Sequence, residues 1–277
     1  MTPSPPRRGP ARPAQRRRPP TGAPRPRRDL DGVGGEQVEG RRAVLELLRA
    51  QRRVVRRIVI ADQQESSSIL DAIEIEAQRR RVTVQIVSMA RLDREARTEG
   101  HQGVVAFADP LPTVSIDELI DDPRAFLLVS DGVTDPRNRG AMLRSADGAG
   151  ITGVILPRHR AARVVPTVTK TAAGAIEYLD FCDVGGIPSA LETLNRAGVL
   201  TVGLASEATT SLYELDLGAG PIALVVGGEE KGLAALTRKR CAAVVSIPQR
   251  GRIESLNAGV AVSIAAFEIA RQRDARA

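Results

Sequence analysis

The chain has 277 residues, 42% of them hydrophobic, which is enough to build the core of one large domain or two ordinary ones. No apolar run approaches the roughly 20 residues of a membrane-spanning helix, and the N-terminus lacks the apolar segment of a secretory signal. The formal net charge is +7, and the two histidines and two cysteines form neither a metal-ligand pattern nor a disulfide pattern. We therefore expect a cytoplasmic protein without a metal, in which Cys182 and Cys241 are buried thiols.

The positive charge lies in the first 28 residues, which contain nine arginines, nine prolines and no acidic residue. Without these nine arginines the remaining chain has 31 basic and 33 acidic residues, a net charge of −2. A segment of this composition cannot bury a core, so we predict a disordered basic arm over residues 1–35. Such arms bind the phosphate backbone of nucleic acids without regard to sequence, although a solubilising tail has the same composition.

An α/β unit is predicted after the arm. Apolar residues at helical spacing predict helices, and short β-branched runs predict strands between them. The expected order is helix 41–50, strand 54–61, helix 69–80, strand 82–87, short helix 89–97 and strand 102–107. Alternation on this scale predicts a small domain, to which we assign residues 36–108.

A second α/β unit is predicted after residues 109–123, a stretch rich in proline and acidic residues that we interpret as a linker running into a short helix. Its first strand, 126-FLLVS-130, is apolar throughout, as is typical of a buried parallel sheet. Further strands are expected at 153–156, 199–205, 222–228 and 243–248, with helices at 141–150, 189–198 and 258–270. We assign residues 124–277 to this domain, an α/β fold around a parallel sheet.

Polar clusters follow three of these strands. They are 131-DGVTDPRNRGAMLR-144, 227-GGEEKGL-233 and 247-IPQRGRIESLN-257. Ligands of open parallel sheets bind beyond the carboxyl ends of the strands, so the clusters are candidates for a functional site. Each cluster also has a structural explanation: Asx hydrogen bonds in a turn, a glycine turn between strand and helix, and capping of the buried helix by Ser255 and Asn257.

The motifs of several enzyme classes are absent from the sequence. The glycine cluster fits neither G-x-x-x-x-G-K-[ST] nor G-x-G-x-x-G, which argues against a P-loop protein or a dinucleotide-binding dehydrogenase. No G-x-S-x-G motif indicates a hydrolase, and no group of carboxylates indicates metal-dependent phosphoryl transfer.

Together the clusters resemble three motifs of the SpoU–TrmH class of RNA ribose 2′-O-methyltransferases. The shared patterns are D-G-V-T-D-P-x-N-x-G-x-x-x-R-S-A, V-x-G-x-E-x-x-G-L and I-P-x-x-G-x-x-x-S-L-N, in this order and at similar spacing. In addition, 40-GRRAVLELLRA-50 and 101-HQGVVA-106 resemble the substrate-binding domain of the RlmB-like branch, which is similar to ribosomal protein L30e. The resemblance covers residues 38–273 and rests on several separated motifs.

The resemblance implies a fold, a cofactor and an assembly. The fold would combine an L30e-like substrate-binding domain with a C-terminal domain whose chain forms a trefoil knot, a rare feature that periodicity does not predict. The cofactor would be S-adenosylmethionine, bound at Gly227, Gly228, Ile247 and Leu256. The assembly would be a homodimer in which the last helix contributes to the interface.

The implied reaction transfers a methyl group from the sulfonium of the cofactor to a ribose hydroxyl. The residues that match the family's polar set are Asn138, Arg144, Glu229, Ser255 and Asn257. Because arginine is essentially always protonated, we expect Arg144 to orient a phosphate and stabilise the developing oxyanion rather than to act as a base. Structuring the cofactor loop is the alternative role for Glu229.

The implied substrate is RNA, most specifically a guanosine of 23S ribosomal RNA, either naked or in a ribosomal precursor particle. The alternatives are an adenosine-modifying enzyme of the thiostrepton-resistance type, a transfer-RNA methyltransferase, and a non-catalytic RNA-binding protein with the same fold. The retained polar set argues against the last of these. Glu230, Arg139 and 249-QR-250 depart from the family's pattern and bear on RNA preference. The residues expected to contact RNA are Arg41, Arg42, Arg139, Lys231 and Arg252.

Overall fold

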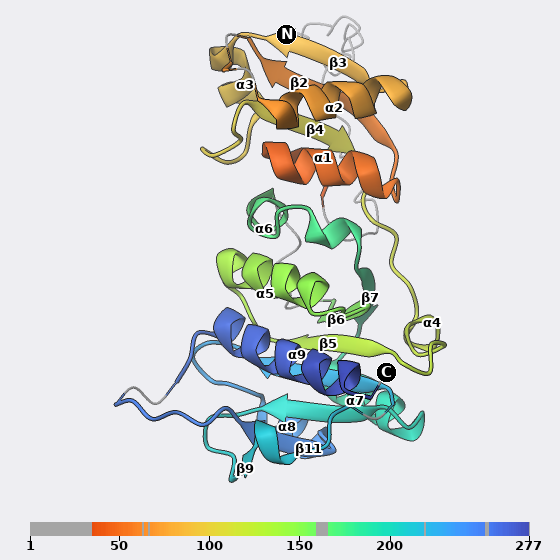
Figure 1. The fold of residues 1–277 in the computed structure, drawn as a ribbon, viewed down its shortest axis with the longest axis vertical. Coiled ribbons are helices and arrows are strands. Elements are labelled where there is room, and N and C mark those ends of the chain that lie inside the picture. The colour runs from red at the N-terminus through yellow and green to blue at the C-terminus, as the bar shows by residue number, and fades with distance from the viewer. Residues whose placement is uncertain are drawn as a thin grey trace, which may run out of the picture. The chain divides into compact units, whose positions relative to one another are not determined.

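The computed structural model describes residues 35–62, 64–65, 67–158, 166–218, 220–252 and 255–276. Residues 1–34 of the predicted basic arm lie outside these ranges. Helices and strands follow one another along the described chain, and the strands form two separate sheets (Figure 1). Within these ranges, no helix is long and apolar enough to cross a membrane.

The first sheet has four strands in the order β1-β4-β2-β3. Strand β4 runs antiparallel to β1 and β2, whereas β2 and β3 are parallel. The predicted helix at 41–50 has the observed bounds, and the other predicted elements agree with the structure to within two residues. Only the three-residue strand β1 was not predicted, because three residues carry no periodicity. The elements are β1 (Gln37–Glu39), α1 (Arg41–Ala50), β2 (Val55–Ala61), α2 (Ser68–Arg79), β3 (Thr83–Val87), α3 (Met89–Glu95) and β4 (Val104–Ala108).

The second sheet has seven strands, all parallel, in the order β7-β6-β5-β10-β8-β11-β9. This parallel sheet confirms the predicted α/β class, while the domain boundaries and the knot stay predictions. The strands are β5 (Phe126–Asp131), β6 (Gly153–Pro157), β7 (Asp180–Val184), β8 (Leu200–Leu204), β9 (Thr210–Ser211), β10 (Ile222–Gly227) and β11 (Ala243–Ser246). The helices are α4 (Ile116–Leu119), α5 (Pro136–Gly148), α6 (Pro166–Thr171), η1 (Ala175–Glu177), α7 (Ile187–Arg196), η2 (Leu212–Glu214), α8 (Ala235–Arg240) and α9 (Ala258–Asp274).

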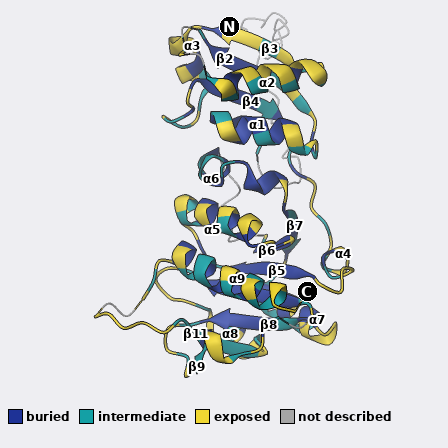
Figure 2. Ribbon diagram, in the orientation of Figure 1, coloured by how far each residue is buried: buried dark blue, intermediate teal, exposed yellow. Residues whose placement is uncertain are grey.

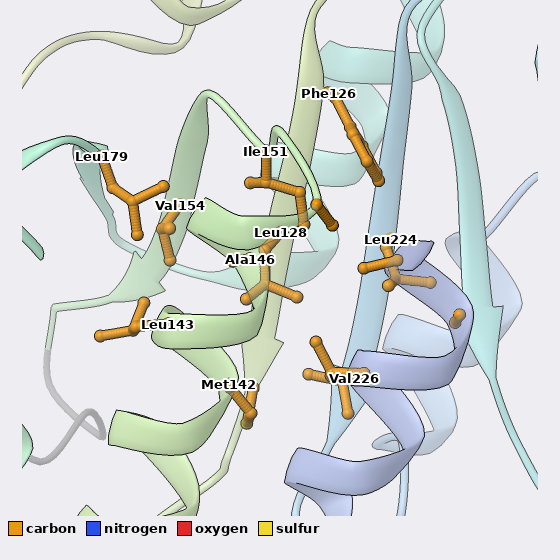
Figure 3. Packing of buried hydrophobic residues seen from close by; sticks show 14 of the residues in the cluster. Phe126, Leu128, Met142, Leu143, Ala146, Ile151, Val154, Leu179, Leu224 and Val226 are labelled. Carbon is orange, nitrogen blue, oxygen red and sulfur yellow. The ribbon is translucent and has the colours of Figure 1, made fainter. Parts of the chain in front are cut away.

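Helices cover both faces of the parallel sheet. On one face, α5 and α9 bury a cluster that includes Met142 and Leu143 together with Leu128 of β5 and Val226 of β10 (Figure 3). On the other face, α7 buries its apolar side against β5 and β10. The central strands are therefore buried almost throughout (Figure 2). Burial on both faces explains why these strands are continuous apolar runs in the sequence.

Two differences from the sequence-based prediction bear on the site. Helix α5 begins at Pro136 rather than at residue 141, because the Asp135 carboxylate accepts the backbone N–H groups of Arg137 and Asn138 and so caps the helix. Strand β7 was not predicted, because acidic residues at two of its five positions hide its apolar character.

A buried ion pair joins two residues that are 124 positions apart in the sequence. The side chains of Arg53 and Glu177 are 1% and 0% exposed, and Nε of Arg53 donates to Oε2 of Glu177 over 3.0 Å. Burial raises the pKa of Glu177, and the charge of Arg53 opposes this shift. Removing either partner would leave the other charge buried without a counterion and would destabilise the folded protein.

Candidate active site

The first two polar clusters meet at the carboxyl edge of the parallel sheet. Gly227, the last residue of β10, pairs in register with Asp131, the last residue of β5. The loops that follow lie so close that a Cβ on Gly228 would be 2.6 Å from the carbonyl oxygen of Gly132. Oδ2 of Asp131 accepts the backbone N–H of Ala234 over 3.2 Å and so ties the two loops together.

The Asn138 side chain joins all three clusters. Its Nδ2 donates to Oε1 of Glu229 over 2.9 Å, and its Oδ1 accepts from Nδ2 of Asn257 over 2.8 Å. The partners are 91 and 119 residues away in the sequence, so only the fold brings them together. Three of the five predicted catalytic residues thus form one hydrogen-bonded chain.

Asn257 also caps helix α9. Its Oδ1 accepts the backbone N–H groups of Gly259 and Val260, over 2.9 and 3.4 Å. Asn257 therefore has both predicted roles: its Oδ1 caps the helix, and its Nδ2 donates to Asn138 in the candidate site. The starts of α5 and α9 are closely packed, since a Cβ on Gly259 would lie 3.4 Å from Cβ of Ala141.

A cavity of about 370 Å³ lies beside this chain of hydrogen bonds. Its wall includes all four residues expected to bind the cofactor, Gly227, Gly228, Ile247 and Leu256, and also Glu229 and Ser255. A Cβ on Gly227 would overlap the backbone of Gly232, so only glycine allows this wall its shape. The wall also includes Gly228 and Gly232, and glycines leave backbone N–H and C=O groups uncovered by a side chain, which suits a cofactor bound through such groups.

The cavity also includes residues that the sequence analysis missed. Ser206 and Glu207 follow strand β8, and Gln249 lies in the third cluster. The carboxyl-end rule that identified the other clusters, applied to strand 199–205, would have found Ser206 and Glu207.

Arg144 stands apart from the hydrogen-bonded chain. It is exposed on α5, and within the described residues it makes no hydrogen bond or ion pair. Six residues along an α-helix correspond to an axial rise of about 9 Å and a rotation that turns Arg144 about 120° away from Asn138. Because Arg144 is exposed and no described residue binds its guanidinium, that group is accessible to a ligand.

The structure corrects the expectation that Arg139 contacts RNA. The residue is 2% exposed, and its guanidinium donates to the carbonyl oxygen of Val133. Burial lowers the pKa of Arg139, and the negative charge of Glu229 opposes this shift. The sequence placed Arg139 beside Asn138, but consecutive helical residues point in directions about 100° apart, and this one points inward.

The other basic residues expected to contact RNA lie at the surface or near it. Lys231 and Arg252 are exposed. The Arg42 side chain is 60% exposed and lies 3.8 Å from Glu46. Arg41 is half-buried, and its Nε donates to the carbonyl oxygen of Gln102 over 3.0 Å, which fixes its position.

The two cysteines lie away from the hydrogen-bonded chain. Cys182 is buried in β7, as expected, whereas Cys241 is only half-buried. Burial raises the pKa of each thiol to about 11, so both are protonated at neutral pH.

Comparison with known proteins shows which family the chain resembles. The model of the SpoU rRNA methylase family matches residues 125–267, and the model of the RNA 2′-O ribose methyltransferase substrate-binding domain matches residues 37–114. The 23S rRNA (guanosine-2′-O-)-methyltransferase RlmB of Pseudomonas syringae pv. tomato is 38% identical over 247 residues, covering 87% of this chain and 97% of the relative. The protein of the same name from Ralstonia nicotianae is 46% identical over 186 residues, covering 66% and 74%.

Solved structures agree with this relationship. The SpoU methyltransferase AviRb from Streptomyces viridochromogenes, in complex with the cofactor AdoMet, superimposes with a TM-score of 0.71 at 26% identity, covering 86% of this chain and 90% of that one. The chain belongs to the SpoU rRNA methylase family.

Proposed function

We propose that the protein transfers a methyl group from S-adenosylmethionine to the ribose 2′-oxygen of a guanosine in 23S ribosomal RNA. The observation that carries the proposal is the Asn138 amide, which joins Glu229 and Asn257 across three motifs beside the cavity of about 370 Å³. Relatives that bear this activity in their names align with nearly their whole length. A ribosomal RNA substrate supports a cytoplasmic location.

The cofactor's fit rests on the cavity wall. Gly227 and Gly228 let the loops of the wall pack closely against Gly232 and Gly132, while Ile247 and Leu256 supply apolar side chains. Ser255 and Gln249 supply polar groups on the same wall. When bound there, S-adenosylmethionine provides the electrophilic methyl group.

The protein's own residues position the acceptor. Asn138 is held between Glu229 and Asn257, so its orientation is fixed before the RNA arrives, and little ordering is required at the moment of reaction. Glu229 fixes the loop after β10 through the same bond. The exposed Arg144 guanidinium orients the phosphate beside the target ribose and stabilises negative charge developing on the 2′-oxygen.

The proposal includes a homodimer formed through α9. Val260 and Phe267 of α9 are 46% and 51% exposed although both are large apolar side chains. Exposed large apolar side chains of this kind are typical of surfaces that bind another protein. A second copy packed on α9 would cover them close to Asn257, at the start of the same helix.

RNA is bound in this proposal by surface cations around the cavity and on α1. Lys231 lines both cavities, Arg252 is exposed in the third cluster, and Arg41 and Arg42 lie at the start of α1. Residues 1–35 add nine further arginines, which bind phosphates without regard to sequence.

The test uses purified protein, tritiated S-adenosylmethionine and 23S RNA from cells that lack the modification. Label at one guanosine 2′-oxygen, lost in Asn138→Ala, is the expected result. Label at an adenosine or in transfer RNA would refute a guanosine of 23S RNA as the substrate but would leave ribose methylation as the reaction. No label on naked RNA, precursor particles or transfer RNA, despite measurable cofactor binding, would favour a non-catalytic RNA-binding protein.

A further inference from the structure

A second and larger cavity lies on the other side of the loop after β10. Its volume is about 800 Å³, and its wall includes Pro157 at the end of β6 and residues that follow β5, β7 and β10. Asn138 and Glu229 form part of its wall, and Glu229 also lines the smaller cavity assigned to the cofactor. A molecule in the large cavity would thus be separated from the cofactor cavity by the loop after β10, which carries Glu229.

The position of this cavity in the sheet is one where ligands bind. From β5 the chain continues outward to β6 and β7, whereas β10 and β8 lie on the opposite side of β5. The boundary between β5 and β10 is therefore a topological switch point, where the loops diverge and leave a crevice at the carboxyl ends of the strands. The volume is within the range of small-molecule sites and exceeds that of one nucleoside.

The charge of the wall selects the kind of ligand. Four carboxylates line the cavity, those of Asp131, Asp135, Glu229 and Glu230, against the single amine of Lys231. Such a wall repels phosphate and favours a group that presents N–H donors. Thr237 also lines the cavity; it is 1% exposed, and its Oγ1 has no hydrogen-bond partner among the described residues. A buried hydroxyl in this state is one that a polar ligand can satisfy.

Two of the carboxylates are fixed in advance. Asp135 is held by the N–H groups of Arg137 and Asn138, over 2.6 and 3.1 Å, through Oδ1. Asp131 is held through Oδ2 by Ala234. Asp135 lies about one helical turn before Asn138 and accepts its backbone N–H. Asp135, rather than Asp131, is therefore adjacent to the hydrogen-bonded residues Asn138, Glu229 and Asn257.

Guanine matches this wall better than the other bases do. Its Watson–Crick edge presents two adjacent donors, N1–H and the N2 amino group, and a carboxylate can accept both. Adenine and cytosine each place an acceptor nitrogen next to their amino group, and uracil has one N–H between two carbonyls. Enzymes that act on a nucleotide commonly extrude it and read this edge in a pocket.

We propose that the large cavity receives the guanine base of the target nucleotide, extruded from the RNA, and that the N1–H and N2 amino groups of this base donate to Oδ2 of Asp135, the oxygen that does not cap α5. This inference rests on the proposed function. With the base in this cavity, the attached ribose reaches the wall of Asn138 and Glu229, which the cofactor cavity shares through Glu229.

The test compares an RNA fragment carrying the mapped target guanosine with fragments that carry inosine or adenosine there. Inosine keeps N1–H and lacks the N2 amino group. Wild-type kcat/KM is expected to fall about tenfold with inosine and about a hundredfold or more with adenosine. Asp135→Asn is expected to lower kcat/KM for guanosine about tenfold to a hundredfold and to bring the ratio of guanosine to inosine close to one.

Two controls separate base recognition from folding and from net charge. Asparagine caps a helix about as well as aspartate, so Asp135→Asn should keep the melting temperature and the affinity for S-adenosylmethionine. Glu230→Gln removes a carboxylate from the same cavity and should leave the ratio of guanosine to inosine unchanged. A ratio that is unchanged in Asp135→Asn, or lost equally in Glu230→Gln, overturns the assignment to Asp135.

The proposed function and the inference fail in different ways. If the wild-type protein labels no guanosine, the proposed function fails and the base assignment fails with it. If the wild-type protein methylates guanosine and inosine equally well, the proposed function stands and only the base-reading cavity is refuted.

Discussion

Replacing Asn138 by alanine should remove both hydrogen bonds that join the three clusters. One bond runs to the Glu229 carboxylate and one comes from the Asn257 amide. A hydrogen bond to a charged group contributes about 1.5–3 kcal/mol and a neutral one about 0.5–1.5 kcal/mol. Because the Glu229 side chain is exposed, solvent weakens the first bond, and we take the lower part of the combined range, about 2–3 kcal/mol.

This energy corresponds to a loss of roughly 30- to 150-fold in kcat/KM, since about 1.4 kcal/mol is a factor of ten. The assay is the initial rate of tritium transfer to the mapped RNA at saturating S-adenosylmethionine. The melting temperature should fall as well, because both bonds join distant segments of the folded chain, so the rate is compared per folded molecule.

Asn195 provides the matched control for this substitution. It also makes two side-chain hydrogen bonds, to the carbonyl of Arg240 over 2.8 Å and from the hydroxyl of Thr201 over 2.7 Å, at the end of α7. Asn195→Ala should therefore lower stability without lowering the rate per folded molecule. A loss below threefold in Asn138→Ala, or an equal loss in Asn195→Ala, would refute the reasoning.

Three further outcomes are expected. Gly227→Ala should abolish S-adenosylmethionine binding in isothermal titration, because the added Cβ would overlap the backbone of Gly232. The control Gly148→Ala should bind normally, because its Cβ would meet only an ordinary van der Waals contact. Normal binding by Gly227→Ala would refute the assignment of the cofactor to this cavity. Glu177→Gln should lower the free energy of unfolding in urea by about 3 kcal/mol, since it leaves the Arg53 charge buried without its ionised partner, and a change below 1 kcal/mol would contradict this. Deleting residues 1–28 should weaken RNA binding and flatten its dependence on salt, with the slope changing by roughly 0.7 for each RNA phosphate that the arm neutralises, whereas an unchanged slope would make the arm a solubilising tail.

Much of the local structure could be predicted because it depends on neighbouring residues. Apolar runs of five or six residues identified β5 and β10, and helical spacing identified α1 with its observed bounds. The prediction failed where tertiary context decides the outcome. Strand β7 is the edge strand beside β6 and tolerates acidic residues there, so its sequence does not look like that of a buried strand.

The candidate site was partly predictable for a similar reason. Strand ends mark the loops that can hold ligands, and this rule identified the three clusters before any fold was known. It could not show which direction each side chain takes. Arg139 and Asn138 are neighbours in the sequence, yet one is buried beneath the loop and the other belongs to the hydrogen-bonded chain.

The sequence by itself determined the α/β class, the parallel strands, the basic arm's composition and the polar residues that match the family, because each follows from local pattern or composition. Only the tertiary structure decided that Asn138 joins Glu229 to Asn257, that a cofactor-sized cavity and a larger one share the wall between them, and that Arg139 is buried. The physical reason is strand order: β10 pairs with β5, although the chain between the end of β5 at Asp131 and the start of β10 at Ile222 first passes through β6, β7, β8 and β9. Contacts set by such pairing leave no periodic trace in the chain.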